Sequence, residues 1–476
     1  MVKARLLSFM LRVAPIMGFV SLPTFGGTLY VRIDGRDAGN GSLNDPWKTV
    51  QRAVDEARAG DIIDIGPGRY EEVVVTRVGG EAEAPIVLRG AAGNSSSIKG
   101  FIVGHSYITL ENLEISGMDV QYGAAVTLSR GVRSVTIRHC RIRETINECG
   151  AIQSAAGKAE EAVSFVSIEN NEFAQISFRG GSPRPVIQLW GRGHRIVGNT
   201  FLGNNDPTVG DNDAIRIFGS DHYIARNVFS GFVYKKGGPH TDIIQTFGDN
   251  GYGSKNILFE HNIIKNCESK LAQLTADSDK LLAGEVHENW TFRNNLIVNM
   301  RYQAMEVYLR NVTIANNLFF RVAYGDGSPA YVVGLNDAGL KGRADGATVA
   351  NNMFIACGPP GREGAWYYQA STLEGVFADF NLVTKDQIDW LPASGFTELH
   401  GVNGGDPGFR NLEAGDFRSS ASGVGVDAGT CGLAPVDFDG VERPRGGGCD
   451  IGPFETEKGK EGPPKPPREL RVKGGA

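Results

Sequence analysis

The sequence predicts an all-β fold in which short strands coil into a solenoid, and three observations support this. A unit of the form apolar-x-x-Asn-x-apolar recurs along the chain. Its spacing varies, because successive asparagines lie 28, 28, 35, 33, 22 and 35 residues apart. The 476 residues include 64 glycines and 21 prolines beside 41% hydrophobic residues, so the chain turns often and still has a core to bury. The repeated asparagines are Asn171, Asn199, Asn227, Asn262, Asn295, Asn317 and Asn352.

A solenoid of strands tolerates this variation because each coil stays constant while its loops change length. Helical repeats keep a stricter length and lack alternating, β-branched segments. Asparagine suits a turn, since it adopts left-handed geometry and bonds its own backbone. Stacked on successive coils, these side chains are expected to bond one another as in other ladders of parallel strands. We therefore interpret the asparagine column as structural.

Composition and charge exclude several other classes of protein. The hydrophobic content is too high for a disordered chain, and no Gly-X-Y period indicates collagen. A net charge of −6 with interspersed signs leaves no basic footprint for nucleic acid. We expect a monomer that does not bind nucleic acid.

The N-terminal residues predict secretion. Lys3 and Arg5 precede a mostly apolar run from Leu6 to Leu22, which is typical of a signal peptide over residues 1–26. No other stretch is long and apolar enough to span a membrane. The predicted location is extracellular or periplasmic.

The remaining chain divides into three parts. Residues 27–385 are predicted to form the solenoid, starting with a helix at residues 47–57 that covers its open apolar end. Residues 386–456 form a Gly-rich C-terminal capping segment, and residues 457–476 form a disordered Pro/Lys-rich tail. Cys140 with Cys149, and Cys431 with Cys449, are close enough in sequence to pair in an oxidising compartment.

A second strand aligns in each coil, with a central position flanked by apolar residues. Alternation points these central side chains outward, as a polar stripe beside a second, aromatic stripe. The polar stripe consists of Gln153, Gln188, Arg216, Gln245, Gln273 and Glu306. The aromatic stripe, two residues further on, consists of Trp190, Phe218, Phe247 and Tyr308. We predict a substrate-binding surface made of Gln188, Trp190, Gln245, Phe247, Gln273, Glu306 and Tyr308.

The chain resembles right-handed parallel β-helix proteins of the pectate-lyase-like superfamily, of the secreted bacterial type. The resemblance covers residues 27–456 and is carried by the repeats and three end motifs. These motifs are WKTVQRAV at 47–54, GDIIDIGPGRY at 60–70 and DFDGVERPRGGGCDIGPF at 437–454. The resemblance implies the fold and a polysaccharide partner. It leaves the activity open, because lyases, epimerases, hydrolases and proteins without known activity share these motifs.

A polar cluster in the middle coils is the candidate site. Aligning the central positions also aligns Asp213, Asp242 and Lys270, each three residues earlier. Neighbouring coils lie about 4.8 Å apart, so two carboxylates and an ammonium group should stack at one corner. His240 precedes Asp242 by two residues and joins this cluster.

The favoured hypothesis is a lyase that performs β-elimination, or a C5 epimerase, on a uronate polysaccharide. Both reactions remove a proton beside a carboxylate, which must be neutralised. Arg216, helped by Gln245, is the candidate neutralising group. His240 or Lys270 is the candidate base, with Asp242 orienting its neighbour. The resemblance also implies calcium, for which Asp211, Asp213 and Asp242 offer oxygen ligands. No organic cofactor is expected.

Two alternatives stay open at this point. A glycoside hydrolase would use Asp213 and Asp242 as its pair of carboxylates, whose spacing of one coil suits a retaining mechanism. A non-catalytic carbohydrate-binding surface protein would instead stack sugars on the aromatic stripe.

Overall fold

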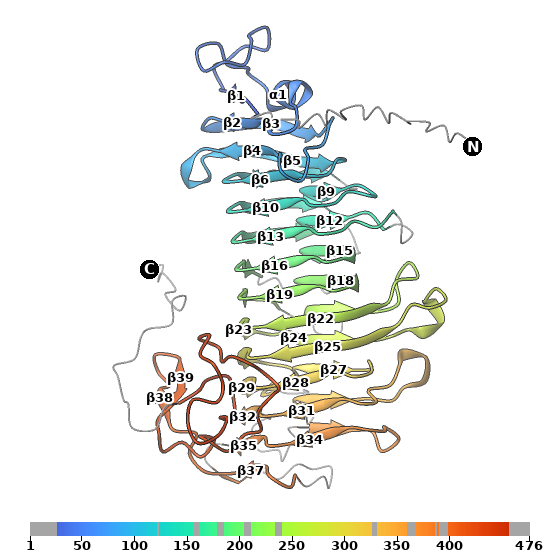
Figure 1. Cartoon of the computed structure of the whole chain (residues 1–476), viewed down its shortest axis with the longest axis vertical. Helices are drawn as coiled ribbons and strands as arrows, with labels where there is room; N and C mark the ends of the chain where they lie inside the picture. Colours follow the sequence, from blue (N-terminus) through green and yellow to red (C-terminus); the bar gives the residue numbers. More distant parts are fainter. Residues whose placement is uncertain are drawn as a thin grey trace, which may run out of the picture.

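The protein is a right-handed parallel β-helix, shown here by a computed structural model (Figure 1). The structure describes residues 26–456 except 121–122, 148, 157–160, 179–184, 204–210, 234–239, 326–330, 359–366, 386–387 and 390–397. Strands β1 to β37 join one continuous sheet, in which β35–β36 is the antiparallel exception among the described pairings. The predicted fold class is confirmed. The predicted signal peptide and C-terminal tail lie outside the described residues.

Each full coil contributes one strand to each of three parallel ladders, which we call the first, second and third ladder in chain order. The first ladder contains β1 (Thr28–Val31), β2 (Ile62–Ile65), β4 (Ile86–Gly90), β6 (Ile108–Glu111), β10 (Thr136–Arg138), β13 (Ser167–Glu169), β16 (Arg195–Val197), β19 (Tyr223–Ala225), β22 (Ser254–Glu260), β25 (His287–Arg293), β28 (Thr313–Ala315), β31 (Thr348–Ala350) and β34 (Phe377–Asp379). The second ladder contains β3 (Gly68–Val75), β5 (Ser96–Val103), β7 (Glu114–Ser116), β11 (Arg141–Asn147), β14 (Glu172–Phe178), β17 (Thr200–Leu202), β20 (Val228–Ser230), β23 (Ile263–Cys267), β26 (Leu296–Met300), β29 (Leu318–Val322), β32 (Met353–Ile355), β35 (Leu382–Lys385) and β37 (Val402–Asn403).

The third ladder carries the candidate site. It contains β9 (Val126–Leu128), β12 (Ile152–Ser154), β15 (Ile187–Arg192), β18 (Ile215–Ser220), β21 (Asp242–Thr246), β24 (Lys270–Leu274), β27 (Met305–Val307), β30 (Val333–Leu335) and β33 (Tyr367–Gln369). Two short strands, β8 (Asp119–Val120) and β36 (Ile388–Asp389), pair with β11 and β35.

The asparagine column forms a continuous hydrogen-bonded ladder at the corner between the first two ladders. Asn199 donates its backbone N–H to Oδ1 of Asn227 at 2.9 Å, and Asn227 does the same to Asn262 at 2.9 Å. Each side-chain Nδ2 also donates to a carbonyl of an earlier coil, as from Asn227 to Ile196 at 2.8 Å. The repeat residue therefore satisfies buried backbone groups at a turn, which confirms the structural interpretation.

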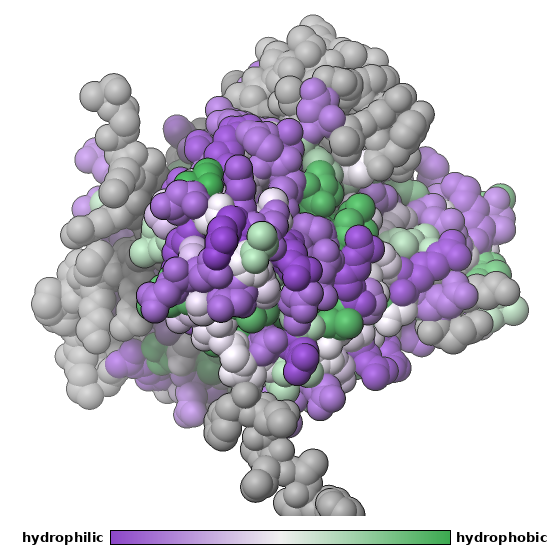
Figure 2. Space-filling view, turned by 90° about the horizontal axis from the view of Figure 1, so that it is seen from above, coloured by the Kyte–Doolittle hydropathy of each residue, from purple (hydrophilic) through white to green (hydrophobic). Residues whose placement is uncertain are grey.

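Helix α1 (Val50–Glu56) covers the N-terminal end of the coil, as predicted. Thr49 caps it by accepting a hydrogen bond from the N–H of Arg52, and Val50, Ala53 and Val54 are buried against the core. Seen from above this end, the described surface is mostly hydrophilic (Figure 2). The open apolar end of the solenoid is thus covered by a polar surface. Short 3₁₀ turns lie at Ala92–Asn94, Ser278–Lys280 and Gly339–Lys341 in the described part of the chain.

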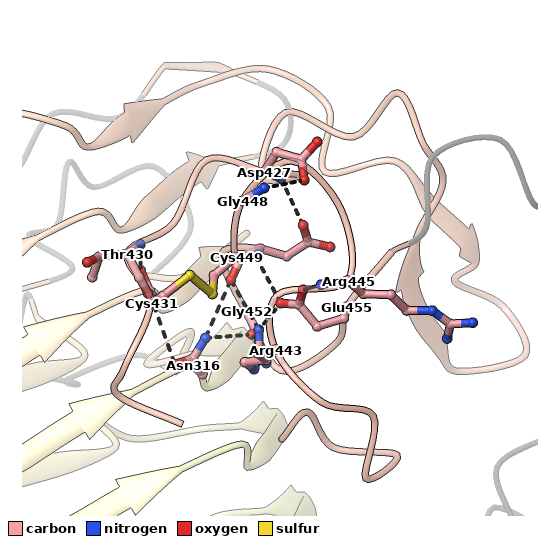
Figure 3. Close-up of a disulfide and its surroundings, with 12 residues drawn as sticks. Asn316, Asp427, Thr430, Cys431, Arg443, Arg445, Gly448, Cys449, Gly452 and Glu455 are labelled. Atoms are coloured by element: carbon pink, nitrogen blue, oxygen red, sulfur yellow. Dashed lines mark hydrogen bonds and ion pairs between the residues drawn. A yellow bond between two sulfur atoms is a disulfide. The ribbon is translucent and has the colours of Figure 1, made fainter. Parts of the chain in front are cut away.

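The C-terminal segment folds back beside the last coils, where strands β38 (Phe409–Asn411) and β39 (Asp416–Ser419) form a hairpin (Figure 1). Asn316 and Asn351 of the solenoid donate side-chain hydrogen bonds to the carbonyls of Gly452 and Thr430. Cys431 and Cys449 form a disulfide in this segment (Figure 3). Cys140, in contrast, is a buried free thiol, so the expected pairing with Cys149 is not formed.

Candidate active site

The predicted polar stripe runs along the outer side of the third ladder in the predicted register. Gln153 pairs with Gln188, Gln188 with Arg216, Arg216 with Gln245, Gln245 with Gln273, and Gln273 with Glu306. Their neighbours Ile187, Leu189, Ile215 and Ile217 belong to the interior core. The side chains of Gln188, Arg216, Gln245 and Gln273 are nevertheless buried. The stripe is thus the floor of a covered region and not an open surface.

A second polar column, formed by Asp213, Asp242 and Lys270, lies on the same outer side as the stripe. The reason is that two consecutive residues of each strand point into the core. Ile243 and Ile244 both belong to the core cluster, so Asp242 before them and Gln245 after them both lie on the outer side. Ala214 with Ile215, and Leu271 with Ala272, repeat this pattern in the adjacent coils. The residues three positions before the stripe therefore stack beside it.

Asp213, Asp242 and His240 form a connected unit. Asp242 donates its backbone N–H to Oδ1 of Asp213 at 2.7 Å. His240 Nδ1 lies 2.6 Å from Oδ2 of Asp242. A carboxylate accepts and does not donate, so Nδ1 carries the proton and Nε2 is left to accept one. The Asp242 side chain is fully buried, whereas that of His240 is 37% exposed.

Arg216 is held by two carboxylates. Its Nε donates to Oδ2 of Asp213 at 2.7 Å, and its Nη2 pairs with Asp211. The guanidinium also lies 5.8 Å from the ring centre of Phe247. Arg216 was predicted to neutralise a substrate carboxylate, but its side chain is only 7% exposed and already has two carboxylate partners. In this structure the guanidinium of Arg216 therefore faces protein carboxylates.

Lys270 and Glu306, on the next two strands of the third ladder, form an ion pair. The Lys270 ammonium donates to Oε1 of Gln273 at 2.8 Å and to Oε2 of Glu306 at 2.9 Å. Glu306 also accepts hydrogen bonds from Gln303 at 3.0 Å and Tyr331 at 3.4 Å. Gln303 and Tyr331 are absent from the predicted site. Gln303 stands three positions before Glu306, and Tyr331 stands three positions before Gly334, which pairs with Glu306 in the next coil. Asp213 and Asp242 have the same offset, and that offset is the signal that marks Gln303 and Tyr331.

Burial and neighbouring charges shift the pKa values of the ionisable groups in this cluster. Burial works against the charged imidazole, but the hydrogen bond and charge of Asp242 raise the pKa of His240 above its ordinary value. Burial raises the pKa of Asp213 and of Asp211, against the pull of the Arg216 charge. Burial also opposes ionisation of Glu306, yet Lys270 lowers the pKa of this carboxyl. Among the accessible groups, His240 is the one suited to exchange a proton near neutral pH.

The three aspartates predicted as calcium ligands do not fit the ion in this arrangement. Asp211 and Asp213 bind Arg216, and Asp242 binds His240. Among the carboxylate oxygens of these three aspartates, Oδ1 of Asp242 is the one that is buried without a hydrogen-bond partner. No group of three or more His, Cys, Asp or Glu side chains in the described parts of the chain is arranged to hold a metal ion. A guanidinium thus stands where the predicted cation would bind.

The aromatic stripe is also covered. Trp190 and Phe218 stack with ring centres 5.3 Å apart, and Phe218 meets Phe247 edge-on at 5.2 Å. Together with Tyr252 they form a small hydrophobic cluster separate from the main core. The rings point outward as predicted, but Phe218 is inaccessible and the row is no open stacking platform. Tyr308 follows β27, two coils beyond Phe247, and is not part of this cluster.

The fold defines a polysaccharide-lyase-like β-helix protein. The sequence matches the chondroitinase B family over residues 45–326, more than half of the chain, and the chain belongs to that family. A pectate lyase of Emericella nidulans, PEL9, is 39% identical over 75 residues, which span 15% of this chain and 18% of that protein. The chain thus spans less than a fifth of the length of this relative.

Solved structures show the same fold. The xylose complex of XylC has a TM-score of 0.59 at 11% identity and covers 90% of this chain and 98% of that one. A rhamnogalacturonan lyase has a TM-score of 0.51 at 15% identity, over 82% and 91% of the two chains. A GH136 lacto-N-biosidase from Eubacterium ramulus has a TM-score of 0.50 at 14% identity, over 75% and 67%. No described helix is long and apolar enough to span a membrane.

Proposed function

We propose that this protein is a lyase that cleaves a uronate polysaccharide by β-elimination, with His240 as the base. The observation that carries the proposal is the pairing of an accessible imidazole with a fully buried carboxylate, His240 Nδ1 to Asp242 Oδ2 at 2.6 Å. This pairing fixes the tautomer and leaves Nε2 free of hydrogen bonds to any described residue. Membership of the chondroitinase B family supports the same reaction class.

In the proposed reaction, Nε2 of His240 takes the proton from C5 of the uronate. The electron pair of the broken C5–H bond forms the C4=C5 double bond, and the C4–O bond to the neighbouring sugar breaks. The departing oxygen takes up a proton from water, the imidazolium of His240 returns its proton to the solvent, and the product is an unsaturated uronate. Asp242 stabilises the imidazolium that forms, because its carboxylate lies against Nδ1.

Lys270 is the group proposed to neutralise the substrate carboxylate. It pairs in register with Asp242, one coil from His240. Its side chain is 14% exposed against 7% for Arg216, and it has one carboxylate partner, Glu306, where Arg216 has two. A cation beside the carboxylate stabilises the charge that develops when C5 loses its proton. Arg216 holds Asp211 and Asp213 in place, so its contribution is to the shape of the site.

The hydrolase alternative receives less support. An acid and base pair must reach the glycosidic oxygen and a water molecule. The side chains of Asp213 and Asp242 are both fully buried, and each is held by a cationic or ionisable neighbour. The proposal also includes secretion of the chain, since its substrates are large polymers.

The test is incubation of the purified protein with a panel of uronate polysaccharides, with calcium and with a chelator, followed by ultraviolet absorbance. We expect unsaturated products from the wild type and loss of the signal in His240→Ala. His400→Ala is the matched control, because His400 pairs with Asp379 at 2.8 Å far along the chain. New reducing ends without absorbance would indicate a hydrolase, and inversion at C5 without cleavage would indicate an epimerase. Binding without any product would contradict catalysis.

A further inference from the structure

A pocket lies on the outer side of the third ladder, on coils that precede His240 in the chain. Its volume is about 410 Å³, within the range of ligand pockets in proteins. Its floor is formed by Thr127, Gln153 and Gln188, which occupy one column of β9, β12 and β15. Asp249 and Asn250, from the loop after β21, form part of its wall. Neither His240 nor Asp242 is among its described lining residues.

Two lining side chains hold buried polar atoms without partners. Gln188 is 3% exposed and Trp190 is 4% exposed. Oε1 of Gln188 and Nε1 of Trp190 are both hidden from solvent and form no hydrogen bond. A buried polar atom left unpaired is costly, so such atoms commonly mark the place of a ligand or a water molecule. One is an acceptor and the other a donor, which together suit a hydroxyl-bearing ligand.

The pocket is rigidly built. The backbone N–H of Trp190 donates to Oγ of Ser154 at 2.9 Å, which ties β15 to β12. The indole ring stacks on Phe218, and Tyr252 completes the cluster behind it. Gly191 and Gly219, which pair directly after these aromatic residues, bring the two strands close together. A site with this support is organised before the ligand arrives.

The lining chemistry selects against a charged sugar. Its described polar groups are amides, hydroxyls and the indole N–H, and its charged described residue is the carboxylate of Asp249. No lysine, arginine or histidine is among the described lining residues. A uronate carboxylate would meet the like charge of Asp249, whereas an uncharged sugar carries no charge for Asp249 to repel.

We propose that this pocket binds an uncharged sugar ring. The Gln188 strand is two coils before the strand that begins with Asp242, a separation of about 10 Å along the solenoid axis. The pocket is therefore a specificity subsite for a polymer that carries an uncharged ring near the uronate to be cleaved. The assignment of this ring to the substrate of His240 rests on the proposed function, but binding of the ring does not.

The test measures binding without turnover. Isothermal titration with neutral tetrasaccharides of xylose, glucose and galactose, and with trigalacturonate, gives affinities for the wild type and for three variants. We expect Gln188→Ala and Gln153→Ala to weaken binding of a neutral oligosaccharide five- to tenfold, about the effect of one lost hydrogen bond. Asp249→Asn should preserve neutral binding and strengthen binding of trigalacturonate. Gln175→Ala, an exposed glutamine on β14, is the control.

The outcomes separate the two proposals. Equal affinity of the wild type, Gln188→Ala and Gln153→Ala would overturn the subsite, as would the absence of neutral binding at 10 mM ligand, roughly the weak limit of specific recognition. His240→Ala should bind the neutral oligosaccharide as tightly as the wild type. Neutral binding in a protein that forms no unsaturated product would overturn the lyase and keep the sugar site. Thermal unfolding of each variant checks that it is folded.

Discussion

Asp242 donates its backbone N–H to the carboxylate of Asp213 at 2.7 Å, and this bond joins two adjacent coils of the third ladder. Through it, the Arg216–Asp213 pair on one coil is connected to the Asp242–His240 pair on the next. The proposed base is thus held in place by a chain of charges that begins one coil earlier.

Removal of Asp213 should therefore affect stability and activity together. Asp213→Ala leaves the buried Arg216 with one carboxylate fewer and the Asp242 N–H without its acceptor. We expect a loss of about 3 kcal/mol in the free energy of unfolding, measured by urea denaturation. Asp213→Asn keeps an acceptor oxygen and should lose less. An Asp221→Ala variant should lose less, because the hydrogen bonds that Asp221 accepts from Ser220 and Asn256 are exposed. Equal effects at the two positions would contradict the connecting role of Asp213.

The pH dependence of the proposed reaction follows from the raised pKa of His240. The base must be neutral, so kcat/KM should rise as pH increases through a value above the ordinary 6.5. Asp242→Asn removes the charge that raises this pKa and should move the rise to lower pH, with at least about a tenfold lower rate. The measurement is the rate of formation of unsaturated product between pH 5 and 10. An unshifted profile in Asp242→Asn would argue against His240 as the titrating group.

Two buried histidines predict a loss of stability in mild acid. His194 and His222 stack with ring centres 4.7 Å apart, and each ring accepts a backbone N–H at Nδ1. Burial lowers the pKa of His194 to about 4 and that of His222 well below its ordinary value. The unfolded chain then binds more protons, so stability falls as pH drops from about 6.5 to 4, by on the order of 3 kcal/mol for His194.

The measurement is the urea midpoint at several pH values in that window. His194→Asn should be less stable at pH 7 but show a shallower decline with acid. A variant that declines as steeply as the wild type would assign the acid sensitivity to other groups.

The asparagine ladder should be costly to interrupt. Asn227→Ala removes the acceptor for the N–H of Asn199 and the donor to the carbonyl of Ile196, both buried. We expect about 3 kcal/mol of destabilisation by thermal or urea unfolding, since several buried groups lose partners. Asn411→Ala, at an exposed position in the C-terminal hairpin, should cost much less. Similar costs at both positions would show that the ladder adds little to stability.

Gly219 should tolerate no side chain. It has a φ of +102°, and a Cβ there would lie 1.7 Å from the carbonyl oxygen of Gly191. Gly219→Ala should therefore destabilise the protein by more than about 2 kcal/mol and weaken neutral-sugar binding by displacing β15. Gly93→Ala, also at positive φ but with open space around it, isolates the conformational cost alone.

The sequence by itself determined the β-helix, the capping helix and the alignment of two polar columns. A repeat of strands with period-two alternation can pair in one register only, since a shift by one residue would turn Ile215 and Ile244 out of the core. Gln188, Arg216, Gln245, Gln273 and Glu306 consequently appear in the predicted order.

Only the tertiary structure decided what these side chains do. Arg216 binds Asp211 and Asp213, and Glu306 accepts hydrogen bonds from Lys270, Gln303 and Tyr331. The outward rings of Trp190 and Phe218 are buried in one cluster with Tyr252. Those contacts involve residues of loops that do not repeat along the chain, and ion pairs between residues on different coils. The repeat pattern of the sequence specifies neither. The period of the sequence sets the direction of each side chain, but the charge and burial around it select its partner.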